Sequence, residues 1–243
     1  MEHYLNRLLE SRGWHFISYC LLLIILAGCN SGQAPKAYSQ TVLSEVALPQ
    51  PRLSSSISLE EALLKRRSLR EYSPRPPELA EVSQLLWAAQ GITGKDYPFR
   101  TAPSAGATYP LETWLVVGTI TGLEPGVYHY KIASHSLEFA KRGDFREALS
   151  NASVFQQHVK LAPATIVLTA VYERTTERYG TRGGMYVYME AGHVGQNICL
   201  QAEALGLGTV PVGAVDEQAV AEILGITGSN QVPVYIFPFG HKP

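Results

Sequence analysis

The sequence predicts one α+β domain behind a short N-terminal leader. Helical and strand patterns are mixed along the chain, without the regular strand–helix alternation of a doubly wound fold. Residues 164–172 (ATIVLTAVY) are continuously apolar, which is typical of a strand buried on both faces. Residues 183–208 contain the longest helical pattern, which is apolar or small around nearly its whole circumference from 185 to 205. Such a helix is central in its fold or lies in a dimer interface.

Two helices are expected at the start of the folded part. The first begins after Ser58, where the capping-box pattern S-x-x-E occurs, and ends near Arg67. Its apolar face consists of Leu59, Ala62 and Leu63. The second covers residues 76–91, with Pro77 in its first turn and Gly91 at its end.

The remaining pattern predicts a sheet with two further helices. Short strands are expected at residues 113–118, 126–132, 136–140, 164–172 and 232–240. The pair 126–132 and 136–140 reads as a hairpin across a short polar turn. Gly206 ends the long helix, residues 209–215 form a short strand and turn, and Asp216 caps a last helix. Together these elements give a mostly antiparallel sheet flanked by helices.

Composition excludes several classes of protein. The chain has 243 residues, of which 46% are hydrophobic, so it can form a real core. Lys and Arg number 20 and Asp and Glu 21, for a net charge of −1. Binding of nucleic acid by bulk charge is excluded, because it needs a clustered basic excess. The sequence lacks zinc, Walker and G-x-S-x-G patterns, so neither a metal site nor a catalytic triad is predicted.

The N-terminus resembles the signal of a bacterial lipoprotein. Residues 17–28 are apolar over a length too short for a membrane span, and L-A-G-C ends at Cys29, the residue lipidated in such proteins. We therefore expect a signal peptide (1–28), a Ser- and Pro-rich tether (29–56) and a folded domain (57–243). This implies a domain outside the cytoplasm, anchored in the cell envelope. Asn30 after the cysteine favours the outer membrane, whereas an uncleaved anchor is the alternative reading.

After cleavage Cys199 is the one thiol besides the lipidated residue, and its apolar helical setting indicates a buried, unreactive side chain. No intrachain disulfide is therefore expected.

Two segments near the start of the domain could bind a ligand. In Lys65–Arg70, the guanidinium groups of Arg66 and Arg70 are four residues apart and share one side while the helix lasts, with the hydroxyl of Ser68 between them. That set can hold a phosphate dianion, although a solvated cationic helix end is the simpler reading. Residues 102–110 (APSAGATYP) are small and could lie flat against a planar ligand, or form an ordinary loop.

Two later segments have similar features. Gly192 and Gly195 lie inside the long helix, where each costs roughly 1 kcal/mol relative to Ala, so a ligand or another helix should approach closely. His193 between them is a candidate proton donor or a structural hydrogen bonder. After the helix, the small residues Gly213 and Ala214 leave backbone N–H groups open to a ligand.

Taken in order, the four motifs resemble the nitroreductase superfamily. R-R-S-x-R, P-S-A-G-x-x-Y-P, E-A-G-H-x-x-Q-N and A-L-G-L-G-x-x-x-x-G-A are closest to its SagB-type branch, which includes thiazoline and oxazoline oxidases. The resemblance covers residues 58–243. It implies a domain-entwined homodimer with two FMN molecules at the interface, each site built from both chains.

The resemblance assigns cofactor contacts by position. The segment that grips the FMN phosphate and ribitol matches Arg66, Arg67, Ser68 and Arg70. The loop that covers one side of the isoalloxazine matches Pro103, Ser104 and Ala105. The turn whose N–H points at flavin N5 matches Gly213 and Ala214, and Lys242 is a candidate for a further phosphate contact.

One position departs from the branch. Azoline oxidases carry a Lys-Tyr pair before the long helix for proton abstraction, and the matching residues here are Arg178 and Tyr179. Arginine does not act as a base at neutral pH, so azoline oxidation by that route is disfavoured. Tyr179 and His193 are the candidate catalytic side chains.

The resemblance thus implies an FMN-dependent oxidoreductase that acts on a small molecule by a ping-pong mechanism. NAD(P)H is scarce outside the cytoplasm, so three alternatives stay open for an exported domain. The electron donor is another reductant, or oxygen is the acceptor of an oxidase-like activity, or the leader is not an export signal and NAD(P)H is the donor. The alternative is a non-catalytic envelope lipoprotein that uses the same fold to bind a flavin-like ligand or a partner.

Overall fold

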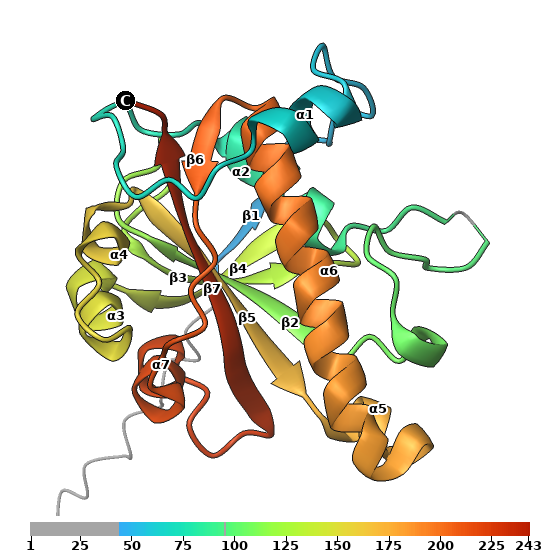
Figure 1. The fold of residues 1–243 in the computed structure, drawn as a ribbon. Helices are drawn as coiled ribbons and strands as arrows, with labels where there is room; N and C mark the ends of the chain where they lie inside the picture. Colours follow the sequence, from blue (N-terminus) through green and yellow to red (C-terminus); the bar gives the residue numbers. More distant parts are fainter. Residues whose placement is uncertain (1–43, 95) are drawn as a thin grey trace, which may run out of the picture. The chain divides into compact units, whose positions relative to one another are not determined.

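The computed structural model describes residues 44–94 and 96–243, and within them seven strands form one antiparallel sheet (Figure 1). The strand order is β1-β4-β3-β2-β5-β7-β6. The strands are β1 (Glu45–Ala47), β2 (Leu111–Val117), β3 (Gly126–Lys131), β4 (Ser136–Arg142), β5 (Ala164–Val171), β6 (Leu207–Thr209) and β7 (Gln231–His241). The predicted antiparallel sheet with flanking helices is confirmed.

Helices cover both faces of this sheet. They are α1 (Leu59–Lys65), α2 (Leu79–Gln90), α3 (Arg146–Ala152), α4 (Gln157–Leu161), α5 (Glu173–Tyr179), α6 (Gly183–Ala204) and α7 (Glu217–Leu224). Two 3₁₀ turns, η1 (Ala105–Ala107) and η2 (Gly180–Arg182), precede β2 and α6. Helices α2 and α6 pack on one face, and α3, α4 and α7 pack on the other (Figure 1).

Strand β5 lies between the two cores, as its continuous apolar run predicts. All eight of its residues are buried. Ile166 and Leu168 pack with α2 and α6, whereas Val167 packs with α3 and α7. The alternation of side chains along a strand explains why both faces of this strand need apolar residues.

Several predicted helix ends are confirmed. The Ser58 hydroxyl accepts a hydrogen bond from the Glu61 N–H at 3.1 Å and caps α1. Asp216 caps α7 in the same way through the Ala219 N–H at 3.0 Å. Gly206 follows α6 with φ 74°, a left-handed conformation that favours glycine at the end of a helix.

The folded part begins earlier than residue 57. β1 pairs with β4, and Leu48 beyond it is 5% exposed in the core, so the segment 45–48 is not tether. The three residues of β1 are too few to show the alternation of a strand, so the sequence does not predict it. Its backbone is held in the strand conformation by pairing with β4.

The apolar face expected for α1 is also only partly buried. Ala62 is covered, but Leu59 and Leu63 are 60% and 52% exposed. Helix α2 begins later than predicted, because a capping box of Glu78 and Glu81 starts it at Leu79 and leaves Pro77 outside.

The predicted leader and its lipidated Cys29 lie outside the described residues, as does the predicted tether up to residue 43. Within the part of the chain that the structure describes, no helix is both long and apolar enough to cross a membrane.

Candidate functional site

The cationic segment 66–70 is extended rather than helical. Arg66 leaves α1 with φ −54° and ψ 125°, so the expectation that Arg66 and Arg70 share one side of a helix is wrong. The segment instead runs beside β6, where the Leu69 N–H donates to the Thr209 carbonyl at 3.0 Å. Ser68 forms a parallel bridge with Thr209, so the segment passes along the edge of the sheet.

Close packing holds this segment in place. A Cβ atom on Gly208 of β6 would lie 2.9 Å from the Cβ of Leu69, so the position accepts only glycine without a shift. Arg67 is engaged locally, because its guanidinium donates to the carbonyls of Leu64 at 2.9 Å and Arg66 at 2.8 Å. Arg67 therefore closes the end of α1, a role that its assignment to the phosphate grip did not anticipate.

Arg66 and Arg70 have different neighbours. Burial raises the pKa of the Cys199 thiol to about 11 and the charge of Arg66 opposes this rise, so Arg66 is on the side of Cys199, in the C-terminal part of α6. Burial lowers the pKa of His158, and Arg70 lowers it further, so Arg70 lies near α4. Among the described residues, neither guanidinium nor the Ser68 hydroxyl has a hydrogen-bond or ion-pair partner. Both charges are available to an anion.

Lys242 lies at the same end of α6 as the start of this segment. Its ammonium pairs with Glu203 at 2.7 Å. The pKa of Lys65 is raised mainly by its contacts with Glu61, and the charge of Glu203 adds to this effect. Lys242 thus belongs to the cationic end of the molecule, but its charge is already balanced by one carboxylate.

The small-residue loop 103–109 lies against α6. The His193 Nδ1 is 3.4 Å from the Pro103 carbonyl, and the Asn197 amide donates to the Thr101 carbonyl at 3.2 Å. Within the loop, the Tyr109 N–H donates to the Ser104 hydroxyl at 2.9 Å. The structure therefore brings the predicted His193 and the predicted ring-covering loop together.

A buried carboxyl supports this loop. Glu190 of α6 is 3% exposed, and burial raises its pKa to about 7, against the opposing effects of the Ser104 hydroxyl and the charge of Arg100. Arg100 also donates to Gln90 at 2.8 Å and lies 4.3 Å from the centre of the Tyr109 ring. Glu190 belongs to the E-A-G-H motif, but no pattern in the sequence indicates a role for its carboxyl.

Arg178 and Tyr179 contact the same loop from α5. The Arg178 guanidinium donates to the Gly106 carbonyl at 3.1 Å. A Cβ atom on Gly106 would lie 2.5 Å from the Tyr179 hydroxyl, which shows how closely this side chain packs on the loop. Both predicted catalytic side chains, Tyr179 and His193, are therefore neighbours of the loop, and their roles stay predictions.

The turn at Gly213 and Ala214 is open. Both residues are exposed, and neither N–H donates to another described residue. Tyr235 lies beneath the turn, 3.7 Å from where a Cβ of Gly213 would be, and Tyr235 packs on Phe237. On α6, a Cβ on Gly195 would lie 2.8 Å from Phe237, which confirms the close approach predicted for that glycine. Gly192 faces open space instead.

The turn between α3 and α4 was not predicted from the sequence. Val154 and Phe155 are 67% and 72% exposed, and both have left-handed backbones, with φ 56° and 57°. Such angles are rare outside glycine, above all for a β-branched residue. The turn adjoins the 213–216 segment, because the Asp216 N–H donates to the Ala152 carbonyl at 2.7 Å. No periodicity in the sequence marks this feature.

The predicted contacts thus form two groups along α6. One contains the segment 66–70 and Lys242 towards the C-terminal end of α6, and the other contains the loop 103–109 with Tyr179 and His193, while the turn 213–214 lies over Tyr235. No hydrogen bond joins the two groups among the described residues. This separation agrees with a site built from both chains of a dimer, which stays a prediction.

A hollow of about 430 Å³ lies elsewhere, between the segment 55–62, α2 and α6. Thr101 and Asn197 line it, but none of the residues assigned to the cofactor does. No cluster of three or more possible metal ligands occurs in the residues that the structure describes.

Comparison with known proteins identifies a family. Residues 63–241 match the model described as "Nitroreductase family". The chain is 44% identical over 198 residues to MJ1384 of Methanocaldococcus jannaschii, named as a candidate nitroreductase, covering 82% of this chain and 96% of that one. It is 32% identical over 130 residues to the trifolitoxin-processing protein TfxB of Rhizobium leguminosarum, covering 51% of this chain and 35% of TfxB.

Solved structures share the fold. A crystal structure of a candidate nitroreductase from Ralstonia eutropha superimposes with a TM-score of 0.72 at 27% identity, over 82% of this chain and 90% of that one. The NADPH:FMN oxidoreductase of Vibrio harveyi superimposes with a TM-score of 0.55 at 20% identity, over 75% and 68% of the two chains, which shows a common fold alone.

Proposed function

The chain belongs to the nitroreductase family of oxidoreductases, and from this premise we propose that it uses FMN to transfer electrons between small molecules. The observation that carries the proposal is the pair of guanidinium groups, Arg66 and Arg70, which flank Ser68 in the segment that runs beside β6. These groups have no other partner among the described residues. Guanidinium groups suit a phosphate dianion, because they form paired, charge-assisted hydrogen bonds.

The rest of the donor set fits a flavin. In this proposal the free N–H groups of Gly213 and Ala214 face flavin N5, and Pro103, Ser104 and Ala105 of the partner chain in a homodimer cover the ring. Lys242 adds a positive charge near the phosphate end, and Arg67 supports the segment by closing α1. A bound FMN would supply the hydride- and electron-transfer chemistry, and a single open face would give ping-pong kinetics.

The residues of this chain then bind, orient and exclude water. His193, at the edge of the loop, is the candidate to hold a proton near the substrate, and Tyr179 places its hydroxyl at the same loop. The exposed Phe155 beside the segment 213–216 supplies an apolar contact for the substrate. No side chain is required as a nucleophile.

Membership of the SagB-type branch is part of the proposal. The likeness to TfxB supports it, as do the E-A-G-H and P-S-A-G motifs. Arg178 argues against proton abstraction from an azoline, because its guanidinium is permanently charged and donates to the Gly106 carbonyl. We therefore favour hydride transfer from a donor to a small acceptor over azoline oxidation. The donor is NAD(P)H or another reductant.

The flavin assignment is tested on the full-length protein as purified. We expect a visible flavin spectrum that a donor bleaches and an acceptor restores. A flavin that dithionite reduces but no donor or acceptor turns over favours the non-catalytic lipoprotein. A colourless protein that takes up no added FMN contradicts the proposal.

We also propose that a signal peptide (1–28) precedes a chain lipidated at Cys29 and held at the outer membrane. The substitution Cys29→Ala should move the protein from the membrane fraction to the soluble fraction. Equal membrane recovery of both forms contradicts this localisation.

A further inference from the structure

The loop before β2 is strained. Gly106, Ala107 and Tyr109 all have left-handed backbones, with φ 59°, 53° and 46°. For residues other than glycine this conformation costs roughly 1–2 kcal/mol each, because Cβ approaches the following carbonyl oxygen. Such a conformation persists only where surrounding contacts determine it strongly. The loop therefore needs something outside itself to keep this shape.

Helix α5 supplies three such contacts. Arg178 donates to the Gly106 carbonyl at 3.1 Å, and Arg174 donates to the Tyr109 carbonyl at 3.1 Å. Between them, the hydroxyls of Thr175 and Thr108 are 2.8 Å apart. Because Arg174 and Arg178 are four residues apart and Thr175 follows Arg174, one side of α5 holds the strained residues.

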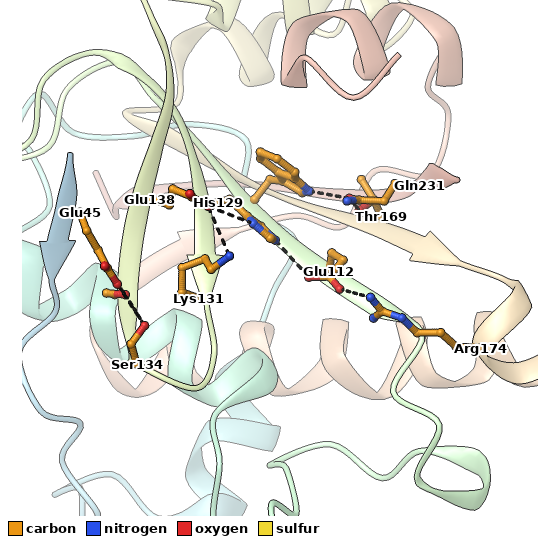
Figure 2. A network of polar contacts seen from close by, with 11 residues as sticks. Glu45, Glu112, His129, Lys131, Ser134, Glu138, Thr169, Arg174 and Gln231 are labelled. Carbon is orange, nitrogen blue, oxygen red and sulfur yellow. Dashed lines mark hydrogen bonds and ion pairs between the residues drawn. The ribbon is translucent and has the colours of Figure 1, made fainter. Parts of the chain in front are cut away.

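The same helix is anchored to the sheet. Arg174 pairs with Glu112 of β2 at 2.7 Å, and Glu112 contacts His129 of β3 at 3.0 Å (Figure 2). Burial acts to raise the pKa of Glu112, but its hydrogen bonds with His129 and Arg174 hold that pKa below its ordinary value. The carboxylate therefore keeps its charge and fixes the position of α5 relative to β2.

A side chain at position 106 would obstruct the contact between α5 and the loop. A Cβ at that position would lie 2.5 Å from the Tyr179 hydroxyl and 2.8 Å from the Arg178 guanidinium. The absence of a side chain lets α5 approach the loop backbone directly. A planar guanidinium presents several N–H donors in fixed directions, which suits a backbone carbonyl better than a single flexible ammonium does.

We propose that Arg178 is a positioning residue, which holds the strained loop 103–109 through the Gly106 carbonyl in the conformation that covers the flavin. The inference rests on the proposed function, because the loop is assigned to the flavin there. Arg178 acts on the loop and not on the substrate, so its removal should loosen the loop without removing a proton acceptor. Arg178, which occupies the position that the resemblance links to base catalysis, therefore orients the loop in this chain.

The test measures the loop without the cofactor first. In flavin-free full-length protein, Arg178→Ala should speed amide hydrogen exchange at residues 106–109 roughly tenfold to hundredfold, the range expected for loss of one hydrogen bond to a charged group. Arg178→Lys should restore part of the protection. The control Arg182→Ala removes a nearby exposed arginine that contacts Tyr186 instead of the loop, and should leave exchange unchanged.

A second variant guards against a general folding defect. Thr175→Val keeps the shape of a side chain that is 1% exposed but removes its contact with Thr108, and should speed exchange over the same residues. Exchange at 106–109 that is unchanged in both Arg178→Ala and Thr175→Val overturns the proposal.

Turnover and cofactor affinity then separate this inference from the proposed function. Loss of positioning predicts weaker FMN affinity or a raised KM, with a pH profile like that of the wild type. A kcat that collapses with a shifted pH profile, while exchange is unchanged, makes Arg178 catalytic and overturns the proposal. Faster exchange with unaltered FMN affinity supports the loop contact and contradicts the placement of the loop on the flavin.

Discussion

The buried carboxyl of Glu190 gives the sharpest prediction about stability. Its pKa is raised from the ordinary 4.5 to about 7, mainly by burial. A carboxyl with a higher pKa in the folded state than in the unfolded state favours folding fully below pH 4.5, and that contribution is lost as the pH rises through 7. A gap of about 2.5 pH units, at 1.36 kcal/mol per unit, corresponds to about 3 kcal/mol.

The substitution Glu190→Gln removes this ionisation and keeps the shape of the side chain. At pH 8 we expect it to raise the melting temperature by roughly 6–12 °C, since about 1 kcal/mol shifts a domain of this size by about 2–4 °C. At pH 4.5 the two proteins should melt together. The measurement is thermal unfolding from pH 4.5 to 8, with the exposed Glu177→Gln on α5 as the control for loss of one negative charge.

One result refutes the reasoning on Glu190. If Glu190→Gln lowers the melting temperature more at pH 8 than at pH 4.5, the native carboxyl is charged and stabilised by Arg100. The charge of Arg100 would then affect the pKa of Glu190 more than burial does.

Three further predictions concern packing and the substrate face. Gly195→Ala should destabilise the fold by about 1–3 kcal/mol in urea unfolding, because the new methyl group would lie 2.8 Å from Phe237, whereas Gly192→Ala should stabilise α6 by up to about 1 kcal/mol. The opposite order of these two variants contradicts the packing of α6. Val154→Gly should raise stability by about 1 kcal/mol through relief of a left-handed backbone, and a fall would show that the valine side chain packs on something. Phe155→Ala should raise the KM of an aromatic acceptor at unchanged melting temperature, and an unaltered KM removes Phe155 from the substrate face.

Elements with strong local patterns were predictable from the sequence. β5 and α6 have long apolar runs, and their buried positions follow from those runs. The caps of α1 and α7 follow from single polar side chains, Ser58 and Asp216, because such a cap needs only nearby backbone N–H groups. Where local chemistry decides the structure, the sequence is sufficient.

Elements that depend on distant partners were not predictable. α3, α4 and α5 have five to seven residues each, which is too short for a helix to be stable without tertiary contacts. β1 depends on β4 in the same way. The first helix was expected to end near Arg67, but the segment after it pairs with β6, a contact about 140 residues away that no local pattern contains.

Some features of the candidate site were likewise predictable from local motifs, and others depend on contacts between distant segments. The residue types came from the motifs, and the structure places His193 and Tyr179 at the loop 103–109, a proximity that the motifs did not indicate. The engagement of Arg67 with α1, the buried Glu190 and the exposed Phe155 depend on how distant segments meet. These features decide which charges remain available to a ligand, so they needed the fold.

The central claim is that Arg66 and Arg70 hold the phosphate of a bound flavin. It is tested most directly by titrating the flavin-free, full-length protein with FMN and with riboflavin, which lacks the phosphate. The wild type should bind FMN on the order of 100-fold more tightly, and the double variant Arg66→Ala/Arg70→Ala should lose most of that preference. Equal affinity of the wild type for the two flavins, or an undiminished preference in the double variant, contradicts the claim.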